Sequence, residues 1–336
     1  MTSLTASADT SELALAIRGL RKAYGKQLAV AGLDLSVPKG IVYGFLGPNG
    51  AGKTTTMRML TGLIEPDQGQ IHIMGKEFSR GNRSPLYEVG ALVESTAYYP
   101  FLSGRRNLLA FAATGQHPPK GRVDELLEMV GLLDRANDKV ESYSLGMKQR
   151  LGIAAALLND PRLLLLDEPS NGLDPAGIVA MRELLRELAA SGKTVFVSSH
   201  ILGEVRMMVD VVGIISAGEL VREGPIEELL DAEAMMRVRV APAEATTAAT
   251  ALATLQGAEA VEPVRGEAGW FTVAVHTDRG SEIARVLVEA GIYPMAIETG
   301  SELEELFLNL TAAASDRDRV GFGVAGAKVE GGGDAR

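Results

Sequence analysis

The segment Gly47-Pro48-Asn49-Gly50-Ala51-Gly52-Lys53-Thr54 decides the fold of this chain. It fits the pattern G-x-x-x-x-G-K-[ST], in which backbone N–H groups and a lysine surround the phosphates of a nucleotide. An apolar, strand-like run, 41–46, precedes it, and a stretch of helical character, 54–63, follows it. The helix would direct its positive N-terminus at the anion. The segment therefore predicts an α/β fold, with Lys53 near the β- and γ-phosphates and the Thr54 hydroxyl offered to Mg²⁺.

Acidic residues end a second strand-like run. The all-apolar run 163–166 suits a central parallel strand that is buried on both faces. Asp167 and Glu168 follow it, so we expect Asp167 to hold Mg²⁺ and Glu168 to orient or deprotonate the attacking water. His200 ends the strand-like region that begins at 194–197 and is placed to reach the γ-phosphate. The plainer alternatives are two solvated carboxylates and a packed surface histidine.

Ser144 opens the helical stretch 145–158. A serine at this position is typical of a helix N-cap. A helix N-terminus with a free hydroxyl and a nearby glycine, Gly146, is also a site for an anion. Both interpretations hold together if the anion arrives from a second subunit.

Composition narrows the class of protein. The chain has 336 residues, which indicates two domains, and 46% of them are hydrophobic, as in a globular protein. It has no cysteine and four histidines, so thiolate chemistry is excluded and a His-rich metal site is not expected. The net charge of −10 disfavours nucleic-acid binding. No secretory signal is visible in 1–12 and no apolar run is long enough to span a membrane, so we expect a cytoplasmic protein.

The pattern of apolar residues divides the chain into four regions. We expect a disordered lead at 1–12, a nucleotide-binding domain at 13–230, an α+β domain at 232–312 and a disordered tail at 313–336. In the larger domain, the expected strands are 13–17, 41–46, 71–74, 163–166, 194–197, 211–216 and 219–222. Its expected helices are 54–63, 123–130, 145–158 and 181–190.

The smaller region has two strand–helix–strand halves, which predict a ferredoxin-like α+β sandwich. Its expected strands are 236–240, 258–264, 270–276 and 292–297, and its expected helices are 246–255, 281–290 and 302–310.

Six motifs in order resemble those of the nucleotide-binding subunit of ATP-binding cassette (ABC) transporters, over residues 13–230. They are Tyr24 as the adenine-stacking aromatic, 47–54 as Walker A, 144–149 as the signature, 163–168 as Walker B, 170–174 as the D-loop and His200 as the switch histidine. The resemblance implies a P-loop NTPase fold with a RecA-like core and a helical subdomain at about 95–160.

The resemblance also implies the site residues. The nucleotide would be bound by Tyr24, Gly47, Pro48, Asn49, Gly50, Ala51, Gly52, Lys53, Thr54, Thr55, Ser144, Leu145, Gly146 and Asp174. Mg²⁺ would be bound by Thr54 and Asp167, and the catalytic residues would be Glu168, His200 and Glu94. ATP and Mg²⁺ are the implied cofactors.

Three residues depart from the family pattern. Glu94 stands where the family usually has glutamine, Leu145 where glycine is common, and Met147 where glutamine is common. These variants resemble the bacterial branch typified by daunorubicin and bacitracin exporters, and 232–312 resembles the accessory domain of that branch. A carboxylate at position 94 adds negative charge near the phosphates.

The resemblance implies two partners. Two copies would face each other head to tail, with each ATP between the Walker A loop of one copy and Ser144-Leu145-Gly146 of the other. A separate membrane permease would receive the movement through 95–106, which includes the aromatic cluster Tyr98-Tyr99-Pro100-Phe101. The protein would then lie on the inner face of the membrane, and nucleic acid is not an expected partner.

Other functions of the same cassette are open at this point. A soluble ribosome-acting ATPase of this kind usually carries two cassettes, and a DNA-repair ATPase usually carries long coiled coils; this chain shows neither. A nucleotide sensor without turnover is disfavoured by Glu168 and His200. An importer subunit stays open, because the cassette does not encode direction.

Overall fold

The computed structural model describes residues 12–94, 97–115, 118–231, 234–255, 260–264, 267–275, 277–301 and 307. The chain divides into two compact units, Met1–Gly224 and Pro225–Arg336. Each unit has a hydrophobic core of its own. Three expectations lie outside the described residues: the lead at 1–11, the tail at 313–336 and most of the helix at 302–310.

A six-stranded sheet forms the centre of the first unit. Its strands are β3 (Val42–Leu46), β6 (Val89–Leu92), β7 (Leu163–Asp167), β8 (Thr194–Ser199), β9 (Val211–Ser216) and β10 (Glu219–Pro225). Their order is β10-β9-β3-β8-β7-β6, and the pairs formed by β3, β6, β7, β8 and β9 are parallel. The leucines of β7 are completely buried, which confirms the central strand predicted at 163–166. Because the strands are parallel, the carboxyl ends of β3, β7 and β8 meet at one edge.

A second, antiparallel sheet lies beside the P-loop helix. Its order is β2-β1-β4-β5, and its strands are β1 (Leu13–Tyr24), β2 (Gln27–Pro38), β4 (Gln68–Ile73) and β5 (Lys76–Phe78). The prediction was wrong here, because it gave β1 five residues and did not include β2. The pairing of β1 with β2 shifts register at several points. Such bulges interrupt the alternation of apolar and polar residues by which a strand is predicted.

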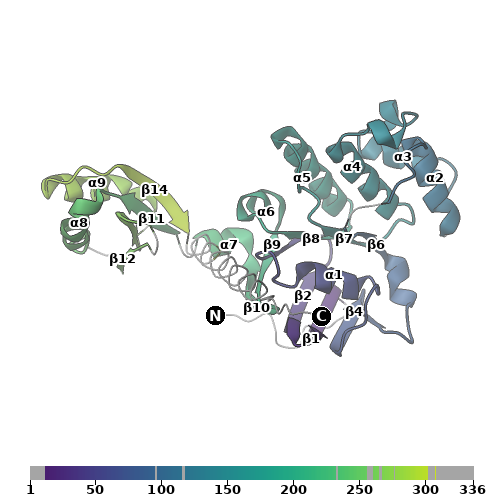
Figure 1. The fold of residues 1–336 in the computed structure, drawn as a ribbon, viewed down its shortest axis with the longest axis horizontal. Coiled ribbons are helices and arrows are strands. Elements are labelled where there is room, and N and C mark those ends of the chain that lie inside the picture. Colours follow the sequence, from purple (N-terminus) through teal and green to yellow (C-terminus); the bar gives the residue numbers. More distant parts are fainter. Residues whose placement is uncertain are drawn as a thin grey trace, which may run out of the picture. The chain divides into compact units, whose positions relative to one another are not determined.

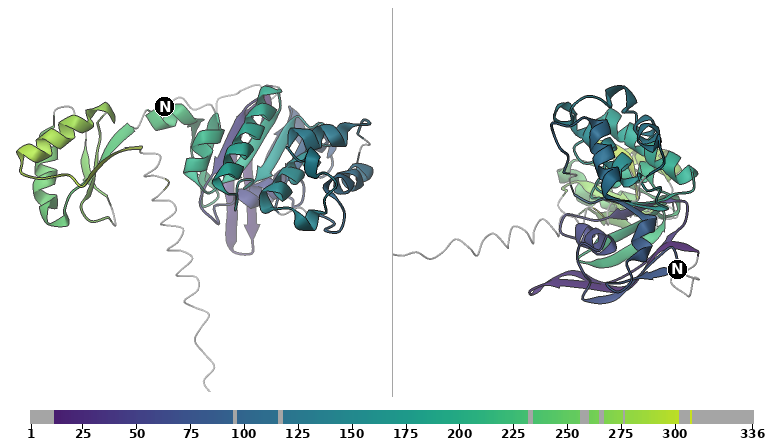
Figure 2. Two further views of the ribbon diagram at one scale, coloured as in Figure 1. Left: turned by 90° about the horizontal axis from the view of Figure 1, so that it is seen from above. Right: turned by 90° about the vertical axis from the view of Figure 1, so that its right-hand side faces the viewer.

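Helices cover both faces of the six-stranded sheet (Figures 1 and 2). Helix α1 (Lys53–Leu60) lies between the two sheets, and α5 (Pro175–Ala190) and α6 (Leu202–Met208) cover the opposite face. Helix α1 ends three residues before the predicted 63. Gly62 has a φ of 69°, a left-handed conformation that commonly ends helices.

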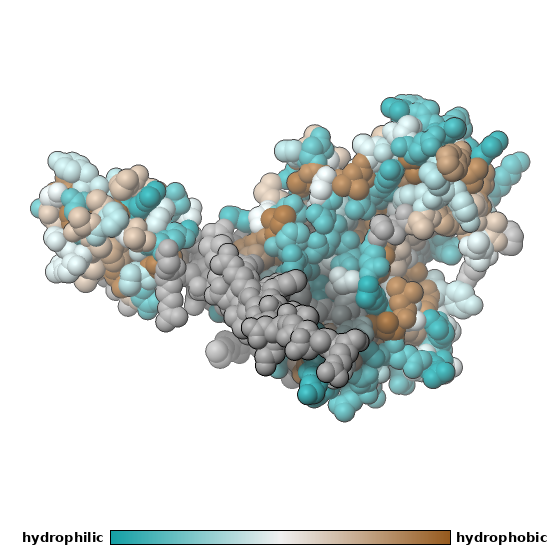
Figure 3. All heavy atoms as spheres, viewed as in Figure 1, coloured by the Kyte–Doolittle hydropathy of each residue, from teal (hydrophilic) through white to brown (hydrophobic). Residues whose placement is uncertain are grey.

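Three further helices form a group inside the region predicted as the helical subdomain. They are α2 (Gly104–Thr114), α3 (Arg122–Met129) and α4 (Leu145–Ala156), and they contact one another. Apolar residues reach the surface over the part of the molecule that carries α3 to α5 (Figure 3). Among the described residues, no helix has the length and apolar composition that crossing a bilayer requires.

The second unit begins with α7 (Ile226–Asp231), which is followed within the described residues by four strands and two helices in the order β-α-β-β-α-β. Its elements are β11 (Ala234–Arg239), α8 (Ala245–Leu252), β12 (Val261–Pro263), β13 (Trp270–Val273), α9 (Gly280–Glu289) and β14 (Ala296–Ser301). The sheet order is β12-β13-β11-β14 and every neighbouring pair is antiparallel. The strand predicted at 292–297 starts four residues later, because the Ile292 N–H is bonded to the Leu287 carbonyl at the end of α9.

Candidate functional site

The loop between β3 and α1 encloses the side chain of Lys53. This side chain is only 5% exposed, and its Nζ donates to the carbonyl oxygens of Gly47 (2.7 Å) and Pro48 (3.2 Å). The ammonium group therefore lies inside the curve of the loop. Of the other predicted residues here, Pro48 and Ala51 are buried, Gly52, Thr54 and Thr55 are half-buried, and Asn49 and Gly50 are exposed.

Two loop glycines are required by close backbone approaches. A Cβ on Gly47 would lie 2.4 Å from the carbonyl oxygen of Ile215, and a Cβ on Gly52 would lie 2.4 Å from that of Ala29. Gly52 also has a φ of 106°, which L side chains rarely adopt. The loop can thus pack against β9 and β2 only because these positions lack side chains.

The acidic residues at the end of β7 lie beside Lys53. Glu168 Oε1 is 3.4 Å from Lys53 Nζ, and Glu168 Oε2 is 2.9 Å from His200 Nδ1. The structure thus joins three predicted residues from three elements into one chain of contacts. Glu168 has a φ of 48°, and such a backbone conformation in a non-glycine residue is often found at functional sites.

Ser198 on β8 orients both acidic residues. Its hydroxyl donates to Asp167 Oδ1 and accepts a hydrogen bond of 3.0 Å from the Glu168 N–H. The prediction did not include Ser198. The signal for it is the pairing of parallel strands, since Asp167 and Ser198 are partners in the register of β7 and β8.

Burial and charge act in opposite directions on Lys53. Burial lowers the pKa of the Lys53 ammonium, while the neighbouring Glu168 and Asp167 carboxylates act to raise it. A buried ammonium group that is poorly solvated is suited to bind an anion of high charge. The phosphates of a nucleotide are such an anion.

The predicted metal ligands, Thr54 and Asp167, fit a magnesium ion that also binds substrate. Mg²⁺ commonly takes one or two carboxylates together with phosphate oxygens and water. Within the described residues, no group of three or more His, Cys, Asp or Glu side chains is arranged to hold a metal by itself. The oxygen donors at the end of β7 and the start of α1 therefore suit a metal that arrives with the nucleotide.

The predicted signature and D-loop residues form a separate group. Ser144, Leu145, Gly146 and Asp174 line a cavity of about 510 Å³ whose lining contains no residue of the P-loop. The Ser144 hydroxyl accepts from the Met147 N–H at 3.3 Å and so caps α4. Asp174 caps α5 in the same way. A single copy therefore presents a phosphate-binding loop and a second helix N-terminus at different places.

Tyr24 and Glu94 lie at the border of the P-loop site. Tyr24 ends β1 and is 48% exposed. Glu94 follows β6, has a φ of 64° and forms an ion pair with Arg58 of α1. No described contact joins Glu94 to Lys53 or Asp167. Arg58 was not predicted from the sequence as a site residue.

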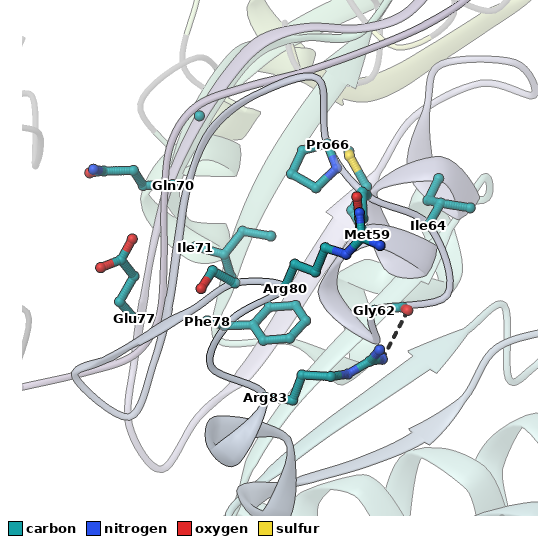
Figure 4. Close-up of a pocket in the computed structure, with 13 residues that line it drawn as sticks. Met59, Gly62, Ile64, Pro66, Gln70, Ile71, Glu77, Phe78, Arg80 and Arg83 are labelled. Carbon is teal, nitrogen blue, oxygen red and sulfur yellow. Dashed lines mark hydrogen bonds and ion pairs between the residues drawn. The ribbon is translucent and has the colours of Figure 1, made fainter.

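A further cavity of about 200 Å³ lies between the end of α1 and the antiparallel sheet. Its floor includes Met59, Ile71 and Phe78, and Arg83 at its side donates to the Gly62 carbonyl oxygen at 3.1 Å (Figure 4). None of the predicted site residues lines it.

A parallel sheet, a phosphate-binding loop and an acidic strand end beside it define a P-loop nucleoside triphosphatase. Residues 30–171 match the family model described as ABC transporter. The chain is 51% identical over 211 residues (62% of this chain, 69% of the relative) to the bacitracin transport ATP-binding protein BcrA of Bacillus licheniformis. It is 36% identical over 318 residues (90% of this chain, 96% of the relative) to the daunorubicin resistance ATP-binding protein DrrA3 of Streptomyces coeruleorubidus.

Solved structures agree with this class. The dimeric ATP-binding cassette MJ0796, in a post-hydrolysis state with ADP and Pi, superposes with a TM-score of 0.57 at 26% identity (63% of this chain, 98% of that one). The chain belongs to the ABC transporter family, and it is an ATPase of that family.

Proposed function

We propose that this chain is the ATP-hydrolysing subunit that drives a separate membrane permease, and that the permease exports a drug or antibiotic. The export assignment is supported by the names of the relatives, which act in bacitracin transport and daunorubicin resistance. The observation that carries the ATPase assignment is the contact of Glu168 with both Lys53 and His200 beside the P-loop.

In this proposal, ATP lies on the P-loop with its adenine on Tyr24. Lys53 binds the β- and γ-phosphates, Glu168 accepts the proton of the attacking water, and His200 orients Glu168 and reaches the γ-phosphate. Mg²⁺, held by Thr54 and Asp167, would neutralise charge on the phosphates.

The second half of each site comes from a second copy of the chain. Ser144, Leu145 and Gly146 lie at a helix N-terminus, which attracts anions, yet they line a cavity without P-loop residues. Two copies placed head to tail bring this group onto the ATP of the partner, with Asp174 at the same junction. The dimeric MJ0796 structure, from a cassette of the same family, supports this arrangement.

The permease would bind near the start of α2. Tyr99 is 59% exposed and Phe101 73% exposed, and these large side chains follow β6 and the segment of Glu94. Aromatic side chains exposed in this way are enriched at protein interfaces. Through this contact the protein would lie on the cytoplasmic face of the membrane.

We also propose that the second unit contains a ferredoxin-like accessory domain at 232–312, which follows the ATPase domain at 13–230 in the sequence. The order of elements, β-α-β-β-α-β, and the antiparallel sheet order β12-β13-β11-β14 support this fold.

A pull-down from native membranes tests the function. Tagged Glu168→Gln protein is incubated with membranes, ATP and Mg²⁺, and Lys53→Ala serves as the control that does not hold nucleotide. We expect Glu168→Gln to recover a polytopic membrane protein. Recovery of ribosomes or of soluble proteins alone would overturn the export function while leaving the ATPase chemistry in place.

A further inference from the structure

The ion pair between Arg58 and Glu94 lies at the border of the nucleotide site. Arg58 is on α1, five residues after Lys53, and Glu94 comes two residues after β6. Strand β6 pairs in parallel with β7, with Leu92 opposite Leu166, so Glu94 and Asp167 leave the sheet at the same edge. The Arg58 Nη2 atom contacts Glu94 Oε1.

This edge of the sheet collects negative charge. Asp167 ends β7, Glu168 comes directly after it and Glu94 follows β6, and a nucleotide bound there would add its phosphates. A third carboxylate would repel the phosphates unless a cation balances it. Lys53 is in contact with Glu168 and with loop carbonyls, whereas Arg58 contacts Glu94.

Both side chains of the pair are partly open to solvent, 39% for Arg58 and 52% for Glu94. The hydrogen bond to Glu94 raises the pKa of the Arg58 guanidinium, and the neighbouring Tyr24 raises it further. Arg58 therefore stays charged, and it lies near two residues predicted to face the nucleotide.

We propose that Arg58 is a positioning residue that balances and orients the Glu94 carboxylate, so that a nucleotide can bind beside an acidic residue at position 94. This inference rests on the proposed nucleotide site and adds a role for a residue that does not itself touch the nucleotide. The glutamine that is common in the family at this position needs no such partner, because it carries no charge.

The effect of removing the Arg58 side chain on ATP affinity should depend on whether position 94 carries a charge. Affinity for ATP·Mg²⁺ is measured by calorimetry in a Glu168→Gln background, where hydrolysis is slow. We expect Arg58→Ala to weaken binding about three- to tenfold, as expected for an unbalanced charge near the phosphates. Arg58→Lys should restore most of the affinity. When Glu94→Gln is also present, Arg58→Ala should change affinity less than about twofold, because the charge to be balanced is gone.

Steady-state kinetics with Glu168 intact give a second readout. Arg58→Ala should raise KM for ATP by a similar factor when Glu94 is intact, and it should change KM less than about twofold relative to the Glu94→Gln single variant when that substitution is present. The control is Arg80→Ala, which removes the partner of Glu65 in another exposed ion pair, 3.4 Å long, and should leave KM unchanged.

Two results would overturn the inference. One is that Arg58→Ala weakens binding equally whether Glu94 is intact or carries the Glu94→Gln substitution; the other is wild-type affinity in Arg58→Ala. In both, the parent protein still binds ATP, so the proposed nucleotide site stands. Absence of ATP binding in the parent protein would instead remove the nucleotide site and the inference together.

Discussion

At the residue scale, contacts on two sides of the Glu168 carboxylate fix its position and orientation. It is held by Lys53 on one side and His200 on the other, and its N–H is bonded to Ser198. These contacts hold the Glu168 carboxylate in place after β7, where we propose that it acts as the general base, and they leave its side chain 22% exposed.

Replacing Glu168 by glutamine keeps the shape of the side chain and removes the proton acceptor. We expect ATP turnover to fall about 100-fold or more, because general-base catalysis contributes about 10²–10⁴-fold. ATP affinity should be retained. Measuring turnover by phosphate release and affinity by calorimetry on the same preparation separates the two effects. Near-normal turnover would remove Glu168 from the catalytic role.

At the element scale, the packing of the P-loop against β9 depends on Gly47. The Cβ of Gly47→Ala would lie 2.4 Å from the Ile215 carbonyl oxygen and 3.2 Å from the Ala51 Cβ. We expect a loss of about 1–3 kcal/mol of unfolding free energy, the usual cost of overpacking. The matched control is Gly203→Ala in α6, where a Cβ meets nothing within 4 Å. This control should be neutral or stabilising by up to about 1 kcal/mol. Equal unfolding free energies for the two variants in urea would contradict the packing argument.

A buried hydrogen bond connects β3 to β10. The Tyr43 hydroxyl, completely buried, donates to Glu223 Oε1 at 2.6 Å. Burial raises the pKa of Glu223 above its ordinary value of 4.5. The folded state therefore binds this proton more tightly than the unfolded chain, so the contribution of Glu223 favours folding below 4.5 and is lost as the pH rises through the raised value.

Glu223→Gln, which does not titrate, isolates this effect. The stability of the wild type relative to Glu223→Gln should decrease as the pH rises above about 4.5, as measured by urea unfolding at a series of pH values. A relative stability that increases with pH would show that Glu223 has a lowered pKa and would contradict the assignment.

Also at this scale, the strand and helix on either side of the P-loop in the sequence, and the strand of the acidic residues, could be predicted, and several other elements could not. The run 163–166 became β7 because an all-apolar segment of that length suits a strand buried on both faces. Strand β2 was missed, since bulges interrupt its alternation. Ser198 and Arg58 were missed for a different reason. Their roles depend on contacts between segments distant in sequence, 31 residues apart for Ser198–Asp167 and 36 for Arg58–Glu94.

At the scale of the whole molecule, the two units have separate cores. The lone tryptophan, Trp270, belongs to β13 of the second unit and lies 4.7 Å from the Arg237 guanidinium. Its fluorescence therefore reports on the second unit alone.

Binding of ATP·Mg²⁺ should stabilise the first unit by mass action. In the Glu168→Gln variant, nucleotide at about 100 times its Kd should raise the circular-dichroism transition of the first unit by about 5–10 °C. The Trp270 fluorescence transition should not move. An equal shift of both transitions would show that the two units unfold as one.

Sedimentation of the Glu168→Gln variant shows whether two copies of the chain share each ATP. With ATP and Mg²⁺ the protein should sediment at twice its monomer mass, because in the proposed dimer each ATP is held by Lys53 of one copy and Ser144 of the other. Without nucleotide, or with Lys53→Ala added, it should sediment as a monomer. A Glu168→Gln protein that binds ATP and still remains a monomer would contradict the shared site.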